Sequence, residues 1–183
     1  MIQLTTSRLL IRDHKPDDLN AYHQLLSNPT VMFRHNGTSR DMEHSKIRLQ
    51  DSIDQINCEK RERYFFCIEK HDTKEFVGEI GYSITKFTPF GKCAGVGYFI
   101  NDNYWGNGYT TEALHEVLRF GFEENDVFRF EAGCLKESFA SERVLLKCGF
   151  IKEVELKEFQ WHDGKLKDRL LFRLLHSEWE KNG

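Results

Sequence analysis

The chain has 183 residues, a formal net charge of −3 and a hydrophobic content of 39%. This size favours a single domain, 1–183, with a buried core, and the small charge favours neither nucleic acid nor a membrane surface as partner. No apolar run approaches the roughly 20 residues of a membrane span, and the N-terminus lacks a signal-peptide pattern, so we expect a cytoplasmic protein.

Hydrophobic periodicity predicts strands and helices in alternation. In chain order we expect a strand over 8–13, a helix from Pro16 to Asn28, a helix over about 39–60, strands over 64–70, 75–85 and 93–101, a helix ending near Phe122, a strand over 128–134, a short helix over 139–147, and strands over 150–159 and 169–175. Because some strands are joined by helices and others by hairpins, this order favours a mixed sheet with helices packed on it.

The cysteines argue against both a disulfide framework and a zinc site. There are five, an odd number, and none are closely spaced. We expect buried, reduced thiols and no metal.

The segment from Asn103 to Leu114 contains a glycine turn between a strand and a helix. Gly106 and Gly108 allow a tight turn, and the first N–H groups of the following helix have no intrahelical partner. Such a turn can hold a phosphate or a pyrophosphate. Neither a P-loop nor a complete dinucleotide fingerprint is present, so an ordinary turn into a helix is the alternative.

The surrounding residues resemble a known family. Residues 94–114 look like the acetyl-CoA signature of the GNAT family of N-acetyltransferases, and Trp105 with Tyr109-Thr-Thr-Glu-Ala113 resembles its RimJ/RimL-like ribosomal-protein branch. The segments 6–12, 141–150 and 174–179 resemble further motifs of that branch in the same order. The resemblance implies an α+β fold with a central mixed, mostly antiparallel sheet flanked by helices.

The resemblance also implies acetyl-CoA as cosubstrate. Backbone groups of Gly106, Asn107, Gly108, Tyr109 and Thr110 would bind its pyrophosphate, and the strand edge at Phe99 and Ile100 would bind pantetheine. Trp105 and Ser138 complete the expected cofactor site. Ser138 stands where the branch usually has Asn, and Leu145 where many members have a catalytic tyrosine.

Two residues are candidates for proton transfer. Glu79 lies in the middle of a predicted strand, which is unusual for an acid, and is the candidate base. A solvated strand face is the alternative. By resemblance, Ser141 is the candidate acid toward the leaving thiolate, and helix capping is its alternative. For Glu112 we prefer an interaction with the helix dipole to a catalytic role.

The expected reaction is direct attack of a primary amine on acetyl-CoA, without a covalent enzyme intermediate. By resemblance the leading acceptor is the α-amine of a protein N-terminus. A small amine (a polyamine, an amino acid or an aminoglycoside) is the alternative, and so is a non-catalytic acyl-CoA sensor. We expect a monomer or a homodimer that binds neither nucleic acid nor membrane directly.

Overall fold

The computed structural model describes residues 1–34 and 39–181, which form two compact units. The first unit comprises Met1–Ser83 and Gly97–Val117, and the second Ile84–Val96 and Leu118–Gly183. Strands β4 (Phe76–Thr88) and β5 (Gly91–Ile100) and helix α4 (Tyr109–Glu123) run through both. The single domain expected from chain length stays a prediction.

In the first unit the strand order is β1-β2-β3-β4-β5, and β1 to β4 pair antiparallel. Its other elements are β1 (Gln3–Thr5), β2 (Leu9–Asp13), η1 (Pro16–Asp18), α1 (Leu19–Ser27), α2 (Pro29–Arg34), α3 (Met42–Ile56), β3 (Arg63–Lys70) and η2 (Asp102–Tyr104).

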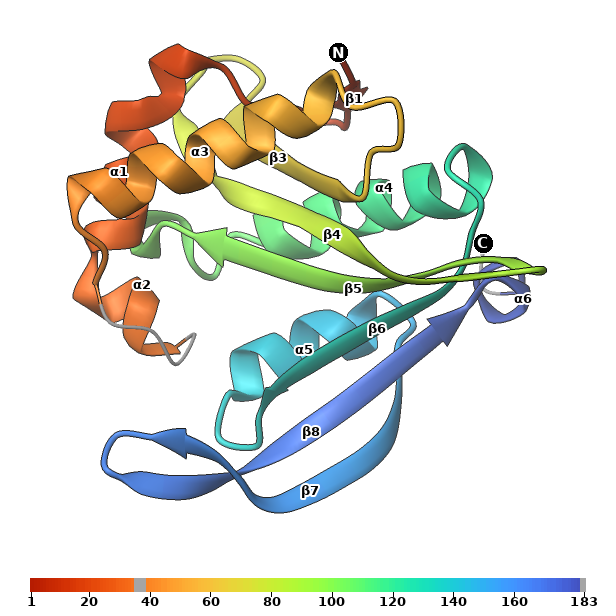
Figure 1. The fold of residues 1–183 in the computed structure, drawn as a ribbon. Coiled ribbons are helices and arrows are strands. Elements are labelled where there is room, and N and C mark those ends of the chain that lie inside the picture. Colours follow the sequence, from red (N-terminus) through yellow and green to blue (C-terminus); the bar gives the residue numbers. More distant parts are fainter. Residues whose placement is uncertain (35–38, 182–183) are drawn as a thin grey trace. The chain divides into compact units, whose positions relative to one another are not determined.

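Helices α1 and α3 lie side by side (Figure 1) and bury their apolar stripes. Tyr22, Leu26, Met32 and Leu49 form a buried cluster there, against which Phe99 of β5 packs. The side chain of Asp41 caps α3 by accepting a hydrogen bond from the His44 N–H at 2.8 Å. This packing places α3 over the strands that carry the candidate site.

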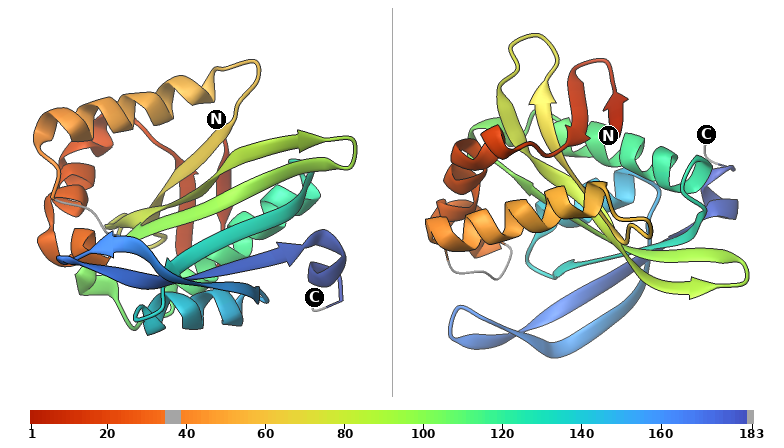
Figure 2. Two further views of the ribbon diagram at one scale, coloured as in Figure 1. Left: turned by 60° about the horizontal axis from the view of Figure 1, so that its bottom comes forward. Right: turned by 45° about the horizontal axis from the view of Figure 1, so that its top comes forward.

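In the second unit the order is β4-β5-β6-β8-β7. β6 (Val127–Leu135) runs parallel to β5, whereas β8 (Lys165–Leu175) is antiparallel to both β6 and β7 (Ile151–His162). Figure 2 shows β7 and β8 as a long hairpin. The unit also contains the helices α5 (Phe139–Lys147) and α6 (His176–Trp179).

The predicted α+β fold with a mixed, mostly antiparallel sheet is confirmed. Sequence patterns missed the short elements β1, α2 and α6. Asn28-Pro29 ends α1 as expected, but it also begins α2. The Asn28 side chain accepts a hydrogen bond from the Thr30 N–H at 2.9 Å, as an N-cap does, and proline suits a first helical position.

The thiols follow the prediction with one exception. Cys67, Cys93, Cys134 and Cys148 are buried, but Cys58 is exposed just after α3. Among residues 1–34 and 39–181, no helix combines the length and apolarity needed to cross a membrane.

Candidate active site

The glycine turn has the backbone geometry expected of it. Gly106 and Gly108 both have φ of 80°, a conformation that other residues adopt only with strain. Helix α4 begins at Tyr109, and the Glu112 N–H donates to the Gly108 carbonyl at 3.1 Å. N–H groups in the first turn of a helix generally lie before the first intrahelical bond, so this end of α4 is suited to receive an anion.

Side chains within the turn hold its shape. The Asn107 side chain donates to the carbonyls of Tyr104 and Trp105 at 3.1 and 3.2 Å. The Trp105 indole donates to the Ile100 carbonyl at 2.9 Å and so ties the turn to the end of β5. Asn107 and Trp105 thus stabilise the turn, whose outer surface at residues 106–108 is exposed.

Glu112 anchors the chain segment before β2 to this turn. Its carboxylate accepts hydrogen bonds from the Thr6 hydroxyl at 2.6 Å, the Arg8 N–H at 3.0 Å and the Arg8 Nε at 2.7 Å. Arg8 also donates to the Asn107 carbonyl at 3.0 Å and lies 4.6 Å from the Tyr109 ring centre. Burial alone would raise the pKa of Glu112, but these hydrogen bonds hold it below its usual range. Sequence reasoning assigned Glu112 only to the helix dipole and missed this anchor.

The end of β5 lies against β4 with a defined orientation. The Asn101 N–H donates to the Val77 carbonyl at 3.0 Å, and a Cβ on Gly78 would lie 2.2 Å from the Phe99 carbonyl oxygen. Phe99 therefore turns its carbonyl toward β4. By strand alternation, the main-chain groups of Tyr98 and Ile100 face the opposite edge. Sequence reasoning named Phe99 and Ile100 for this edge and missed Tyr98, and the Phe99 carbonyl faces β4 instead.

Glu79 lies in β4 opposite Cys67 of β3, and none of its side chain is exposed. The alternative of a solvated strand face is therefore wrong. One carboxylate oxygen lies 3.1 Å from His14 Nε2, and the other accepts from Arg48 at 3.0 Å. Burial alone would raise the pKa of Glu79, but His14 and Arg48 keep it below its usual range.

His14 joins Glu79 to a second buried group of charges. Its Nδ1 lies 3.5 Å from Asp18, and Arg12 donates to both oxygens of Asp18 at 2.8 and 2.9 Å. Burial lowers the pKa of His14, but the two carboxylates outweigh it and raise the pKa overall. Arg12 also pairs with Glu69. Counting protonated His14, three cations face the three carboxylates of Asp18, Glu69 and Glu79.

Asp18, Cys67 and Glu69 have ligand atoms within 4.8 Å of one another, a spacing that suits a cation. The Arg12 guanidinium pairs with both carboxylates, however, and burial holds the pKa of the Cys67 thiol far above its usual range. A metal ion would have to displace an arginine and ionise that thiol. These residues therefore fit an ion-pair cluster better than a metal site.

The second unit carries the two predicted serines. Ser138 is the N-cap residue of α5 by position but makes no side-chain capping hydrogen bond. Ser141 lies in the first turn of α5, where its hydroxyl hydrogen-bonds Cys134. Burial raises the pKa of the Cys134 thiol to about 11, an effect that this hydrogen bond opposes. Ser138 therefore does not cap α5 through its side chain, and for Ser141 the choice between acid and cap stays a prediction.

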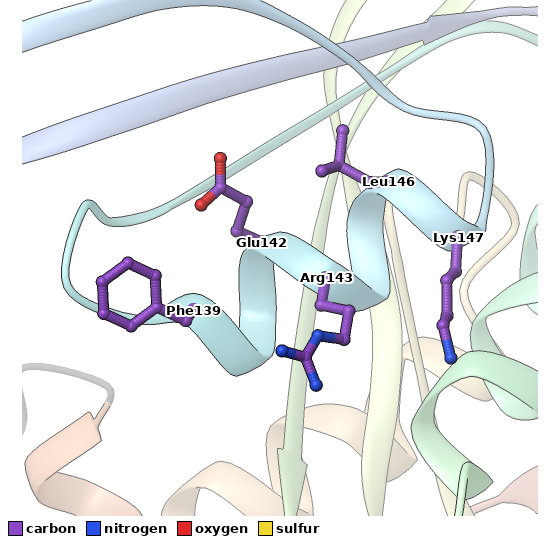
Figure 3. A pocket seen from close by; sticks show the side chains of 5 residues that line it. All are labelled: Phe139, Glu142, Arg143, Leu146 and Lys147. Atoms are coloured by element: carbon purple, nitrogen blue, oxygen red, sulfur yellow. The ribbon is translucent and has the colours of Figure 1, made fainter.

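A shallow hollow of about 410 Å³ also lies on α5 (Figure 3). Phe139 and Glu142 line it together with Leu146, Arg143 and Lys147. Figure 3 shows Arg143 and Lys147, one turn apart, on the same side of the helix. Sequence patterns singled out neither cation, because alternating charge on a short helix is typical of any solvated face.

The predicted residues thus divide between the two units. Glu79 and the expected cofactor residues from Phe99 to Thr110 belong to the first unit, and Ser138 and Ser141 to the second. Within the first unit, the structure brings together a turn suited to pyrophosphate, an adjoining strand end, and a buried carboxylate one strand away.

Known proteins are similar to this chain in sequence and in fold. Residues 8–151 match the profile of the acetyltransferase (GNAT) domain. The uncharacterised N-acetyltransferase YoaA of Bacillus subtilis is 28% identical over 172 residues, which cover 94% of this chain and 96% of that protein. The ribosomal protein uS5-alanine N-acetyltransferase of Escherichia coli is 28% identical over 116 residues, which cover 63% of this chain and 59% of that protein.

A solved structure shares the fold at lower identity. The spermidine N-acetyltransferase from Vibrio cholerae, in complex with CoA and spermine, superimposes with a TM-score of 0.81 at 18% identity, covering 96% of this chain and 99% of that one. The relatives thus include ribosomal-protein acetyltransferases, as the resemblance implied. Because the domain profile spans most of the sequence, this protein belongs to the GNAT family of N-acetyltransferases, whose members use acetyl-CoA.

Proposed function

We propose that this protein transfers the acetyl group of acetyl-CoA to the α-amine of a protein N-terminus. This choice of acceptor rests on one observation, the burial and ion pairing of the Glu79 carboxylate. Its carboxylate is fully enclosed, paired with His14 and Arg48, and has a lowered pKa. Such a group is a weak base, so the acceptor has to lose its proton easily by itself.

The intrinsic basicity of the acceptor then decides which amines react. An α-amine has a pKa near ~8 and a lysine-like amine near ~10.4, so deprotonation at pH 7 costs about 1.4 and about 4.6 kcal/mol respectively. A weak base can assist the first but leaves most of the second cost unmet. This difference favours an N-terminal α-amine over a polyamine.

In the proposed cofactor site, the N–H groups at the start of α4 receive the pyrophosphate, and the β5 edge at Ile100 receives pantetheine amides. The neutral amine nitrogen attacks the thioester carbonyl carbon and the carbon–sulfur bond breaks. CoA leaves as a thiolate that takes up one proton, while the nitrogen releases one. Glu79 stays the predicted base, and a backbone N–H near the end of β5 is the expected oxyanion donor.

Ser141 stays the predicted acid toward the thiolate, and Ser138 a predicted cofactor contact. A thiol with a pKa near ~8.5 is already a tolerable leaving group, so the contribution of an acid is small. We expect Ser141→Ala to lower kcat by only about 2- to 10-fold, less than the roughly 100-fold or more that general acid catalysis typically contributes. Ser138→Ala should instead raise the acetyl-CoA KM, and kcat unchanged in Ser141→Ala would remove that serine from the mechanism.

Two alternatives have support of their own. A small amine is supported by the shared fold with a spermidine acetyltransferase. A non-catalytic acyl-CoA module is supported by the leucine at position 145 and the serine at 138. The predicted cytoplasmic location suits all of these readings and stays a prediction.

A screen of acceptors separates the proposal from these alternatives. Acetyl-CoA is incubated with N-terminally free peptides, their N-formylated controls, amino acids and spermidine, and free thiol release is measured. Release with the free peptides but not with the formylated controls supports the proposal, and faster turnover of spermidine contradicts it. Tight acetyl-CoA binding with no release in any arm supports the binding module instead.

A further inference from the structure

Arg48 on α3 is the accessible cation of the buried charge cluster. Its side chain is 44% exposed, whereas those of His14 and Glu79 are both 0% exposed. Two buried groups fix it from below. Nε donates to the Tyr22 hydroxyl at 2.7 Å, and one terminal nitrogen donates to Glu79 at 3.0 Å. The guanidinium is therefore held in place before any ligand arrives, so little conformational entropy is lost on binding.

The same guanidinium covers the aromatic side chains beside the end of β5. It lies 5.2 Å from the centre of the Phe99 ring and 5.9 Å from that of Phe65. The Phe65 ring in turn lies 3.6 Å from where a Cβ of Gly97 would stand. Arg48 thus lies above the stretch of β5 next to which the proposed function places the acetyl group.

Of the charged side chains in this cluster, the one most exposed to solvent is a cation, Arg48. The cluster balances three cations against three carboxylates, but Asp18 and Glu69 are only 9% and 14% exposed and both pair with Arg12. Arg48 is by contrast the exposed member. An anion approaching β5 from this side meets a cation whose countercharge, Glu79, is enclosed beneath it. Because the Glu79 carboxylate is buried and fixed, an approaching ligand meets the positive charge of Arg48 first, and the electrostatic potential there favours anions.

We propose that Arg48 selects the acceptor by binding a carboxylate that lies close to the reacting amine. This inference rests on the proposed acetyl transfer and names its substrate class as amines that carry a nearby carboxylate. A guanidinium has five N–H donors in a planar fork that matches a carboxylate, and the two fixed hydrogen bonds use only Nε and one terminal nitrogen. A polyamine presents only cations to this site and is disfavoured by repulsion.

Two kinds of acceptor supply this chemistry, and matched pairs distinguish them. Serine against serinamide tests the α-carboxylate of a free amino acid. An amidated peptide beginning Ser-Asp against the same peptide beginning Ser-Asn tests a side-chain carboxylate next to an N-terminus. Spermidine is the cationic arm. We expect kcat/KM of the wild-type protein to favour the carboxylate member of at least one pair by about 10-fold or more, the size expected of one charged hydrogen bond.

The variant Arg48→Gln should reduce that ratio to near 1 while acetyl-CoA affinity stays unchanged. Arg63→Gln is the matched control, because Arg63 belongs to the same unit and is 47% exposed in a surface ion pair with Asp51. It should keep the wild-type ratio. If Arg48→Gln proves unfolded, rising salt applied to the wild type serves instead and should lower the ratio through screening.

The outcomes separate this inference from the proposed function. Acetylation of neutral acceptors with no preference for carboxylates, a preference that survives both Arg48→Gln and salt, or faster turnover of spermidine each overturns the role of Arg48. The first two leave α-amine acetylation standing. If no acceptor in any pair releases CoA, the proposed function and this inference fail together.

Discussion

Two glutamates of the first unit, Glu79 and Glu112, both bind an arginine, yet their surroundings differ. Glu79 is enclosed in the middle of a strand, and its partners are ionisable side chains, His14 and Arg48. Glu112 is 17% exposed in the first turn of a helix and binds Arg8, Thr6 and a backbone N–H. The first sets the charge of a buried network, whereas the second sets the position of the glycine turn.

Removing the negative charge has different consequences at the two positions. An uncharged side chain at position 79 would leave Arg48 without its carboxylate partner and His14 with Asp18 alone, which is costly. An uncharged side chain at position 112 can still accept hydrogen bonds from Thr6 and Arg8, and solvent screens the rest. We therefore expect chemistry to depend on Glu79 and cofactor affinity to depend on the region around Glu112.

The largest effect that we expect is on turnover in Glu79→Gln. Loss of the predicted base should lower kcat/KM about 100-fold, the low end for general acid–base catalysis, because Glu79 is a weak base. Breaking the buried pairs should also lower the free energy of unfolding by about 3 kcal/mol. Thiol release and urea unfolding measure the two effects, and circular dichroism at the assay temperature confirms that the variant is folded.

Glu112→Gln is the comparison for that variant. It should raise the acetyl-CoA KM a few-fold and leave kcat unchanged, because the Glu112 carboxylate holds Arg8, which binds the Asn107 carbonyl of the turn, and lies away from the expected reacting atoms. Unchanged turnover in a folded Glu79→Gln protein would show that the base lies elsewhere. A loss of kcat in Glu112→Gln would remove the contrast between the two carboxylates.

The second prediction concerns Gly108→Trp. The side chain would occupy the space outside the turn, where Arg8 is the nearest group at 3.5 Å from an added Cβ. Acetyl-CoA affinity should fall about 10- to 100-fold, as expected when a charged hydrogen bond to phosphate is lost. Isothermal titration with acetyl-CoA measures it.

Gly164→Trp is the matched control, because Gly164 in the β7–β8 turn also has positive φ, 74°, and open space around it. Both variants should lose about 1–2 kcal/mol of stability through backbone strain. Equal acetyl-CoA affinity in the two would rule out the pyrophosphate role of the glycine turn.

The sequence predicted those features that depend on neighbouring residues. Helix α5 was predicted with the bounds found, 139–147, because periodicity marks its length and turn residues flank it. A tight turn was predicted from Gly106 and Gly108 themselves, and both have the positive φ that glycine adopts readily.

The partners of Glu79 could not be predicted from neighbouring residues. His14 and Arg48 lie 65 and 31 residues away from it in the chain, and only the pairing of β2, β3 and α3 around β4 brings them together. The same is true of the anchor between Arg8 and Glu112, 104 residues apart. Within the sequence, the only local sign of this cluster was an acid in the middle of a predicted strand. Acids are rare at such positions unless they have a partner, so Glu79 indicated that partners come from elsewhere in the chain.

The smallest predicted effect is the pH dependence that His14 gives to stability. The pKa of His14 is raised in the folded protein above the ordinary value near 6.5, so the folded state holds its proton more tightly. This stabilisation is fully present below about pH 6.5 and is lost as pH rises through the folded-state pKa, with a slope of at most about 1.4 kcal/mol per pH unit.

Urea unfolding between about pH 6 and 9 should show the decline in the wild type and a flatter profile in His14→Gln. His44→Gln, which removes a histidine that is 64% exposed, should keep the wild-type slope. If the slope survives in His14→Gln, the proton belongs to another group, and Glu79 then has Arg48 alone as its counterion.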